Sequence, residues 1–206
     1  MASKNRKNRV KFKLTKELIF LVLGLIAIAV TTIVLSQESA SEKKIKSINT
    51  AIIDYNLANN TAYNTITGED VFDIIEHDEL KSTISKNGYV YIYYGSLEKA
   101  SYLENLASIN SAALAAEVKT VYLYYSSWVD GQEDLDAPEF KEEASNREEI
   151  FNKNNDQYDV EDFDITVTPT LLVYHNGDLI FNSQGTTEGW TKIIPIAMGL
   201  SIEIEE

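Results

Sequence analysis

The sequence predicts an α/β domain whose central mixed sheet is flanked by helices. Two strand-like runs, Tyr89–Tyr94 and Val121–Tyr125, enclose the alanine- and leucine-rich segment Leu97–Glu117. Two further short strands, Thr170–Tyr174 and Leu179–Asn182, are joined by an asparagine-glycine turn. A strand-helix-strand unit favours parallel strands, whereas a tight turn joins antiparallel ones, so the sheet should contain both directions.

A long apolar segment precedes this domain. Residues 18–37 are 20 consecutive uncharged residues, and a helix of about 20 residues spans a hydrocarbon core of about 30 Å. Seven of the 18 lysines and arginines lie in residues 1–16, and such charge is retained on the cytoplasmic side of a membrane. The pattern predicts a cytoplasmic basic tail over residues 1–17 and a transmembrane helix over 18–37. The protein would then be a single-pass protein of the cell membrane with an extracytoplasmic domain.

A cleaved signal peptide is the alternative for this segment, because it also begins with basic residues and continues with apolar ones. Its apolar region is shorter, about 7–15 residues, and it ends in a small-x-small cleavage site. The longer uncharged run favours a retained anchor.

The chain between the anchor and the domain is predicted to be a stalk or linker over residues 38–65. Its apolar residues form only a partial helical stripe: Ile45, Ile48, Ile52, Ile53 and Tyr55. The domain follows over residues 66–206. Its first helix is predicted to be capped by Thr67–Asp70 and to end at Lys86–Gly88. The apolar positions at helical spacing within it are Val71, Ile74, Ile75 and Leu80.

The two central strands are apolar on both faces, which is typical of strands covered by helices on each side. Leu97–Glu117 lacks proline and glycine, so a long helix with a right-handed crossover is expected between them. Tyrosines near the ends of these strands can line a groove, namely Tyr93, Tyr94 and Tyr125.

The region after the second central strand is less regular. Trp128–Glu143 is acidic and carries turn signals, so it is expected to be irregular. Ser145–Phe151 is predicted to be a short helix and Asn152–Asp162 a polar loop. A last helix is predicted over Thr186–Leu200, capped by Thr186 or Thr187, and Pro195 should kink or end it.

Three local features occur in the order in which the thioredoxin family has them. Thr168-Pro169 starts the third strand, Asn176-Gly177 makes the following hairpin, and Tyr93–Ser96 precedes the long helix. Over about residues 66–200 the chain therefore resembles the thioredoxin-like superfamily. Residues Val90–Leu106 resemble Gram-positive bacteriocin transport accessory proteins. The resemblance implies a bacterial protein in which Pro169 is cis and faces the position of the family's redox dithiol.

The chain departs from that family because it contains no cysteine. The family's Cys-x-x-Cys would fall at Leu97–Ala100 or Glu98–Ser101, where the sequence reads Leu-Glu-Lys-Ala-Ser. Thiol-disulfide exchange needs a thiolate nucleophile, so the protein acting alone cannot catalyse it. The acidic stretch Asp130–Glu143 lacks the order of an EF-hand loop. No spacing of carboxylates, serines or histidines indicates another catalytic site, so neither enzyme activity nor a cofactor is expected.

Binding is the class of function that these residues leave open. The resemblance implies that the cis-proline leaves the backbone of Thr168 free at the edge of a groove, where it can pair with an extended peptide. The residues of this candidate peptide-binding groove are Thr168, Pro169, Gly95, Ser96, Leu97, Glu98 and Ser101.

Charge restricts the partners. From residue 17 onward the chain has 11 basic against 32 acidic residues, a balance that repels nucleic acid. We therefore expect a protein or peptide partner, together with the membrane through residues 18–37. The predicted function is a redox-inactive accessory or adaptor, which the resemblance links to export. Two alternatives remain: a structural envelope protein that keeps Pro169 only for its turn, and a non-catalytic partner of a cysteine-bearing thiol-disulfide oxidoreductase.

Overall fold

The computed structural model describes residues 40–130, 134–153, 158–184 and 189–203. The expected basic tail and transmembrane helix, residues 1–17 and 18–37, lie outside the described residues. Among the residues that are described, no helix combines the length and the apolar character needed to cross a membrane.

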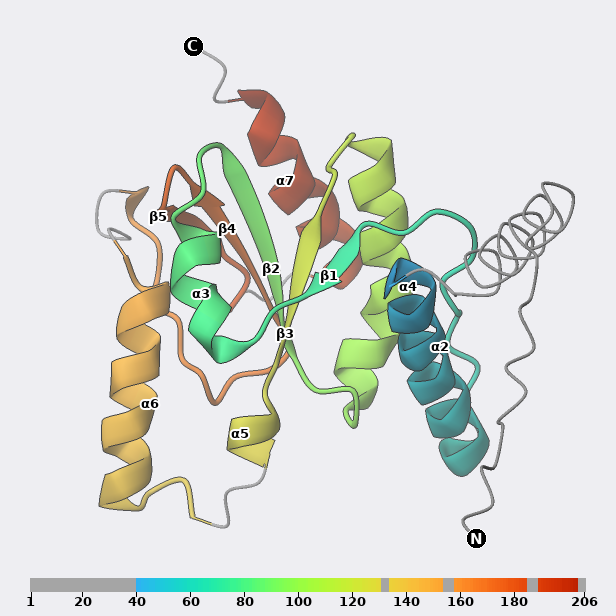
Figure 1. Ribbon diagram of the computed structural model, residues 1–206, viewed down its shortest axis with the longest axis horizontal. Coiled ribbons are helices and arrows are strands. Elements are labelled where there is room, and N and C mark those ends of the chain that lie inside the picture. Colours follow the sequence, from blue (N-terminus) through green and yellow to red (C-terminus); the bar gives the residue numbers. More distant parts are fainter. Residues whose placement is uncertain (1–39, 131–133, 154–157, 185–188, 204–206) are drawn as a thin grey trace, which may run out of the picture. The chain divides into compact units, whose positions relative to one another are not determined.

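Residues Ser41–Glu206 group into one compact unit. Figure 1 shows its helices and strands. In chain order the described elements are α2 (Ala40–Asn59), β1 (Phe72–Ile74), α3 (His77–Ile84), β2 (Tyr89–Gly95), α4 (Ala100–Ala115), β3 (Val121–Tyr125), α5 (Ser127–Asp130), α6 (Pro138–Phe151), β4 (Thr170–His175), β5 (Asp178–Asn182) and α7 (Trp190–Glu203).

The five strands form one mixed sheet in the order β1-β3-β2-β4-β5. β1, β3 and β2 run parallel to one another, β4 is antiparallel to β2, and β5 is antiparallel to β4. The β4–β5 hairpin turns at Asn176 and Gly177, which both have positive φ, as a two-residue turn of this kind requires. This strand order with these directions is that of the thioredoxin-like fold, so the predicted fold class is confirmed at that level.

Helices cover both faces of the sheet (Figure 1). Alternate residues of β2 point to opposite faces. Tyr91 and Tyr93 pack in a core with α2, α4 and α7, whereas Val90, Ile92 and Tyr94 pack in a second core with α3 and α6. The apolar character of both faces of this strand, which predicted a covered central position, therefore follows from two separate cores.

The start of the domain differs from the single helix predicted there. Phe72–Ile74 forms β1, which pairs with β3 so that Phe72 lies opposite Val121. Only the second part is helical: α3 begins after Glu76, whose N–H donates to the Glu79 carboxylate in a capping box. The prediction of one continuous helix was wrong because pairing with a distant strand, which local spacing does not show, decides the first part.

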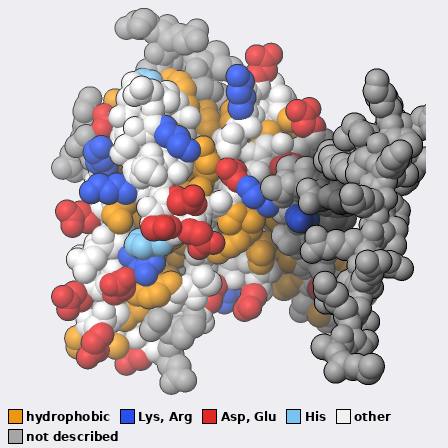
Figure 2. Space-filling model, in the orientation of Figure 1, with side chains coloured by type: hydrophobic (Ala, Val, Ile, Leu, Met, Phe, Trp, Pro, Cys, Tyr) orange, Lys and Arg blue, Asp and Glu red, His pale blue; other side chains and the backbone are white. Residues whose placement is uncertain are grey.

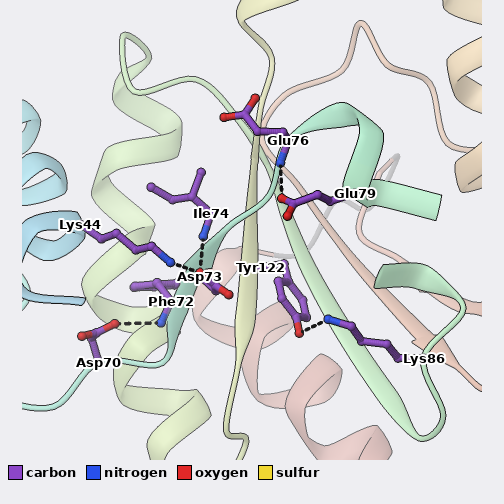
Figure 3. Close-up of polar contacts among 9 residues, drawn as sticks. All are labelled: Lys44, Asp70, Phe72, Asp73, Ile74, Glu76, Glu79, Lys86 and Tyr122. Atoms are coloured by element: carbon purple, nitrogen blue, oxygen red, sulfur yellow. Dashed lines mark hydrogen bonds and ion pairs between the residues drawn. The ribbon is translucent and has the colours of Figure 1, made fainter. Parts of the chain in front are cut away.

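Polar contacts surround the outer edge of β1 (Figure 3). Lys44 of α2 forms an ion pair with Asp73, and Asp73 also accepts a hydrogen bond from the N–H of Ile74. The Asp70 carboxylate accepts a hydrogen bond from the Phe72 N–H at 3.1 Å. Charged side chains at a sheet edge oppose pairing with another strand, so these contacts close this side of the sheet.

The segment predicted as a stalk or linker, residues 38–65, is mostly helix α2, and this helix packs on the domain. Ile48 and Ile52 are fully buried in the core that α4 and α7 share. The Asn49 side chain bonds both the N–H and the C=O of Ile66 at 2.8 Å, which ties the helix to the chain that follows it. The compact unit therefore begins at Ser41, before the expected domain start at residue 66.

Two helices have bounds different from those predicted. α6 begins at Pro138, well before the short helix expected over Ser145–Phe151, because the proline occupies the first turn, where its missing N–H costs nothing. α7 runs from Trp190 to Glu203, so Pro195 does not end it. The predicted caps of this helix, Thr186 and Thr187, lie outside the described residues.

Candidate functional site

The turn between β2 and α4 lies where the family places its redox motif. Ser96 is buried, and its hydroxyl accepts a hydrogen bond from the Glu98 N–H at 3.1 Å. The Ser96 carbonyl accepts a second one from the Lys99 N–H, also at 3.1 Å. These bonds fix the turn. They leave Leu97 half-buried and Glu98 exposed.

Gly95, the last residue of β2, is packed against an aromatic ring. A Cβ added to Gly95 would lie 2.2 Å from Cδ2 of Tyr102. The Tyr102 ring is fully buried and stacks on Tyr93, with centroids 4.4 Å apart and planes 8° from parallel. Glycine is therefore required at this position because the Tyr102 ring lies too close for a Cβ. The ring packs directly against the residue that begins the turn.

The structure brings Thr168 and Pro169 to the same end of the sheet as this turn. The Thr168–Pro169 peptide bond is cis, as the resemblance implied. Tyr94 pairs with Thr170 as the last pair between β2 and β4, so Gly95 and Pro169 are the next residues on the two strands. The Thr170 hydroxyl donates to the carbonyl of Val167 at 2.9 Å and closes the loop before the strand.

Thr168 is half-buried. Within the described part of the chain, its N–H, C=O and hydroxyl make no hydrogen bond outside the strand ladder. Val167 beside it is 38% exposed, although it is apolar. Backbone groups of this kind at a sheet end can pair with an added extended segment.

The last candidate, Ser101, lies in the first turn of α4 and is half-buried. Its carbonyl accepts a hydrogen bond from the Asn105 side chain at 2.7 Å, which is an ordinary contact within the helix. The candidate residues are thus placed around one end of the sheet, and their role in binding remains a prediction.

A hollow of about 390 Å³ opens beside the turn, at the carboxyl ends of β2 and β3. Its lining residues are Ser96, Leu97, Glu98, Tyr125, Ser127 and Asp130. Ser96, Leu97 and Glu98 were candidates from the sequence, and Tyr125 was a predicted groove tyrosine. Ser127 and Asp130 were not assigned to a site, although residues directly after a parallel strand are where α/β sheets place ligands.

Tyr93, Tyr94 and Tyr125 were predicted to line a groove, and Tyr125 does lie at this hollow. Tyr93 and Tyr94 do not line it, because they are fully buried in the two cores. Burial, with a smaller contribution from the Glu76 charge, raises the pKa of Tyr125 to about 12. Its phenol is therefore neutral at physiological pH. Its ring forms an aromatic wall.

The Asp130 carboxylate is held at the rim of the hollow. The Ser126 hydroxyl donates to its Oδ2 at 2.9 Å, and the Ser126 N–H donates to the carbonyl of Gly95 at 2.7 Å. The strand β2, the start of α5 and this carboxylate are therefore connected by two short hydrogen bonds. No set of three or more histidine, aspartate or glutamate side chains is arranged to hold a metal ion in the ranges that the structure describes.

Comparisons with known proteins add little to this picture. No protein-family model matches the sequence, and no curated protein does. Among solved structures, the chain is similar to a yeast mitochondrial 1-Cys peroxiredoxin, whose thiol is resolved through glutathione and thioredoxin systems. The identity is 15%, the TM-score is 0.31, and the match covers 59% of this chain and 85% of that one. The fold assignment rests on the strand order and directions described above.

Proposed function

We propose that this protein is a membrane-anchored, extracytoplasmic and redox-inactive accessory protein that binds an extended segment of a partner protein. The binding edge consists of Thr168 and Pro169 on one side and the turn from Gly95 to Glu98 on the other. The anchor is residues 18–37. The link to export rests on the resemblance to transport accessory proteins alone.

One observation carries the proposal. The backbone of Thr168 has no hydrogen-bond partner outside the strand ladder in the described chain, and it lies at the sheet end where Gly95 closes β2. Backbone N–H and C=O groups are strong hydrogen-bonding groups, and those without a partner in the fold bond to water or to an added segment. A peptide added at this edge would supply those partners. The absence of cysteine removes thiol exchange by the chain's own residues and leaves binding as the function of the edge.

The proposal is tested by capture of the partner in intact cells. A photo-crosslinking amino acid at position 98, an exposed residue of the turn, should capture a specific protein, identified by mass spectrometry. Thr168→Arg should abolish that capture, because a long charged side chain fills the edge. Thr120 is a matched control, since it is also half-buried but precedes β3 at the opposite end of the sheet.

Thr120→Arg should therefore leave capture unchanged, and circular dichroism should show that both variants fold. Capture that survives Thr168→Arg would exclude the edge as the binding site and favour a structural role. A captured protein that carries a redox-active cysteine pair would favour the oxidoreductase-partner alternative.

A further inference from the structure

The hollow beside the proposed binding edge combines acidic and hydroxyl side chains with apolar surface. Glu98 reaches it from the turn after β2, and Asp130 from α5 after β3. Both side chains are exposed, and neither forms an ion pair with another described residue. The hydroxyls of Ser96 and Ser127 lie in the same lining. Two carboxylates that no described lysine or arginine pairs with, on different walls of one hollow, favour a cationic occupant.

Two further walls are apolar. The ring of Tyr125 and the side chain of Leu97 complete the lining. A lysine or arginine side chain has an aliphatic stem that packs on apolar surface and a charged head that stays among polar groups. Its cation is also attracted to the face of an aromatic ring. The hollow thus offers a complementary surface to both parts of such a side chain.

The hollow and the binding edge are close neighbours. Strand β2 lies between β3 and β4. Its last residue, Gly95, pairs with Tyr125 of β3, and the residue before it, Tyr94, pairs with Thr170 of β4. Adjacent strands lie about 4.8 Å apart, and an extended peptide advances about 3.3 Å per residue. Two strand spacings correspond to about three residues of extended chain, so a peptide held at Thr168 that crosses the strand ends is long enough to reach the hollow.

The net negative charge of the domain also favours a cationic partner. From residue 17 onward acidic residues exceed basic ones by 32 to 11, and acidic side chains are spread over the face drawn in Figure 2. A field of this sign raises the local concentration of cationic partners and speeds their association.

We infer that the hollow formed by Ser96, Leu97, Glu98, Tyr125, Ser127 and Asp130 receives an arginine or lysine side chain of the bound peptide, so that the site selects basic partners. This inference rests on the proposed function, because the peptide is held at the Thr168 edge. It adds the chemical class of the segment that is recognised.

The test uses the full-length protein in neutral detergent micelles and a randomised library of short peptides. Enriched peptides should carry arginine or lysine at one position. For one enriched sequence, replacing the arginine by citrulline, which has the same shape without the charge, should weaken binding about tenfold. Glu98→Gln and Asp130→Asn should each weaken binding of the arginine peptide about two- to fivefold, the size expected of exposed charge pairs. Neither should change binding of the citrulline peptide.

Glu142→Gln is the matched control. Glu142 is an exposed residue of α6, and its neutralisation changes the net charge by the same amount away from the hollow. It should leave the preference for arginine unchanged. Equal binding of the arginine and citrulline peptides, or a preference that persists in the Glu98→Gln, Asp130→Asn double variant, would overturn the inference while the proposed function stands. A library in which no peptide is enriched would overturn the proposed function itself.

Discussion

At the end of β2, Gly95 leaves space that the Tyr102 ring occupies. Replacing it by alanine puts a methyl group 2.2 Å from a ring carbon that is fully buried. The ring also stacks on Tyr93, whose hydroxyl donates to the Tyr102 carbonyl at 3.1 Å. Neither tyrosine can therefore move without disturbing the other, and the turn of the candidate site depends on both.

Gly95→Ala should lower the free energy of unfolding by about 1–3 kcal/mol, the usual cost of overpacking a core. Urea unfolding of the full chain followed by circular dichroism measures the change. Gly199→Ala is the control, because a Cβ at that position of α7 meets nothing within 4 Å. It should be neutral or stabilise the protein by up to about 1 kcal/mol. Equal stability of the two variants would show that the Tyr102 ring yields freely.

A second residue-scale feature joins α3, β3 and α6. The Tyr124 hydroxyl lies 2.9 Å from Nδ1 of His77 and accepts a hydrogen bond from Arg147 at 3.4 Å. Arg147 also bonds Glu143 at 2.9 Å. Because the hydroxyl oxygen accepts from Arg147, its hydrogen is free to be donated to a neutral His77 ring. Burial, followed by the positive charge of Arg147, lowers the pKa of His77, while Glu143 and Asp78 oppose this shift.

This shift predicts a dependence of stability on pH. A histidine whose pKa is lowered on folding binds protons more readily in the unfolded state, so stability is complete above about pH 6.5 and falls as the pH drops through that value toward the folded-state pKa. The difference in unfolding free energy between the wild type and His77→Gln should therefore shrink as the pH is lowered from 7.5 to 5.5. A difference that stays constant over this range, measured by urea unfolding at each pH, would contradict the shift.

At the scale of elements, α2 is an integral part of the domain. Ile52 is fully buried in the core, whereas the next residue, Ile53, is 47% exposed. The Asn56 side chain further bonds both the N–H and the C=O of Tyr63 at 2.9 Å. The helix is thus held by apolar burial on one face and by asparagine contacts to the returning chain.

Ile52→Ala should lower the free energy of unfolding by about 2–5 kcal/mol, because it removes buried atoms and leaves a cavity. Ile53→Ala makes the same chemical change one residue later and should cost no more than about 0.5 kcal/mol. Thermal unfolding of the two variants distinguishes them. If the two variants lost the same amount of unfolding free energy, α2 would be a spacer and not part of the core.

Helices and strands were predictable from the sequence where the pattern of their own residues indicates the same structure that the packed fold requires. The central strands, the long helix α4 and the β4–β5 hairpin follow from dense β-branched and aromatic runs, the absence of proline and glycine, and the Asn176-Gly177 turn. β1 was missed because three residues are too few to show a period of two. The start of α6 was missed because an acidic stretch with proline reads as a loop until the packing of Phe140 on Trp128 is known, with ring centroids 4.8 Å apart.

At the scale of the whole molecule, the anchor is the prediction that governs where the domain acts. Residues 18–37 are long enough to span a bilayer, so the full chain should stay in the membrane fraction after alkaline carbonate extraction. Mass spectrometry of the purified protein should show that residues 18–37 are retained. A mass that lacks the first part of the chain, with the protein in the soluble fraction, would instead show that the segment is a cleaved signal peptide.

The sequence by itself determined the sheet's central strands, the acidic charge and the exclusion of thiol chemistry, because strand patterning, charge and the absence of cysteine are properties of residues regardless of their neighbours. Tertiary structure alone decided that α2 joins the core and that β1 is a strand. It also decided that Glu98 and Asp130, far apart in the chain, line one hollow beside the turn after β2. These features depend on which distant segments of the chain pack together. Strand pairing across the sheet decides that packing, and the spacing of residues along the sequence does not show it.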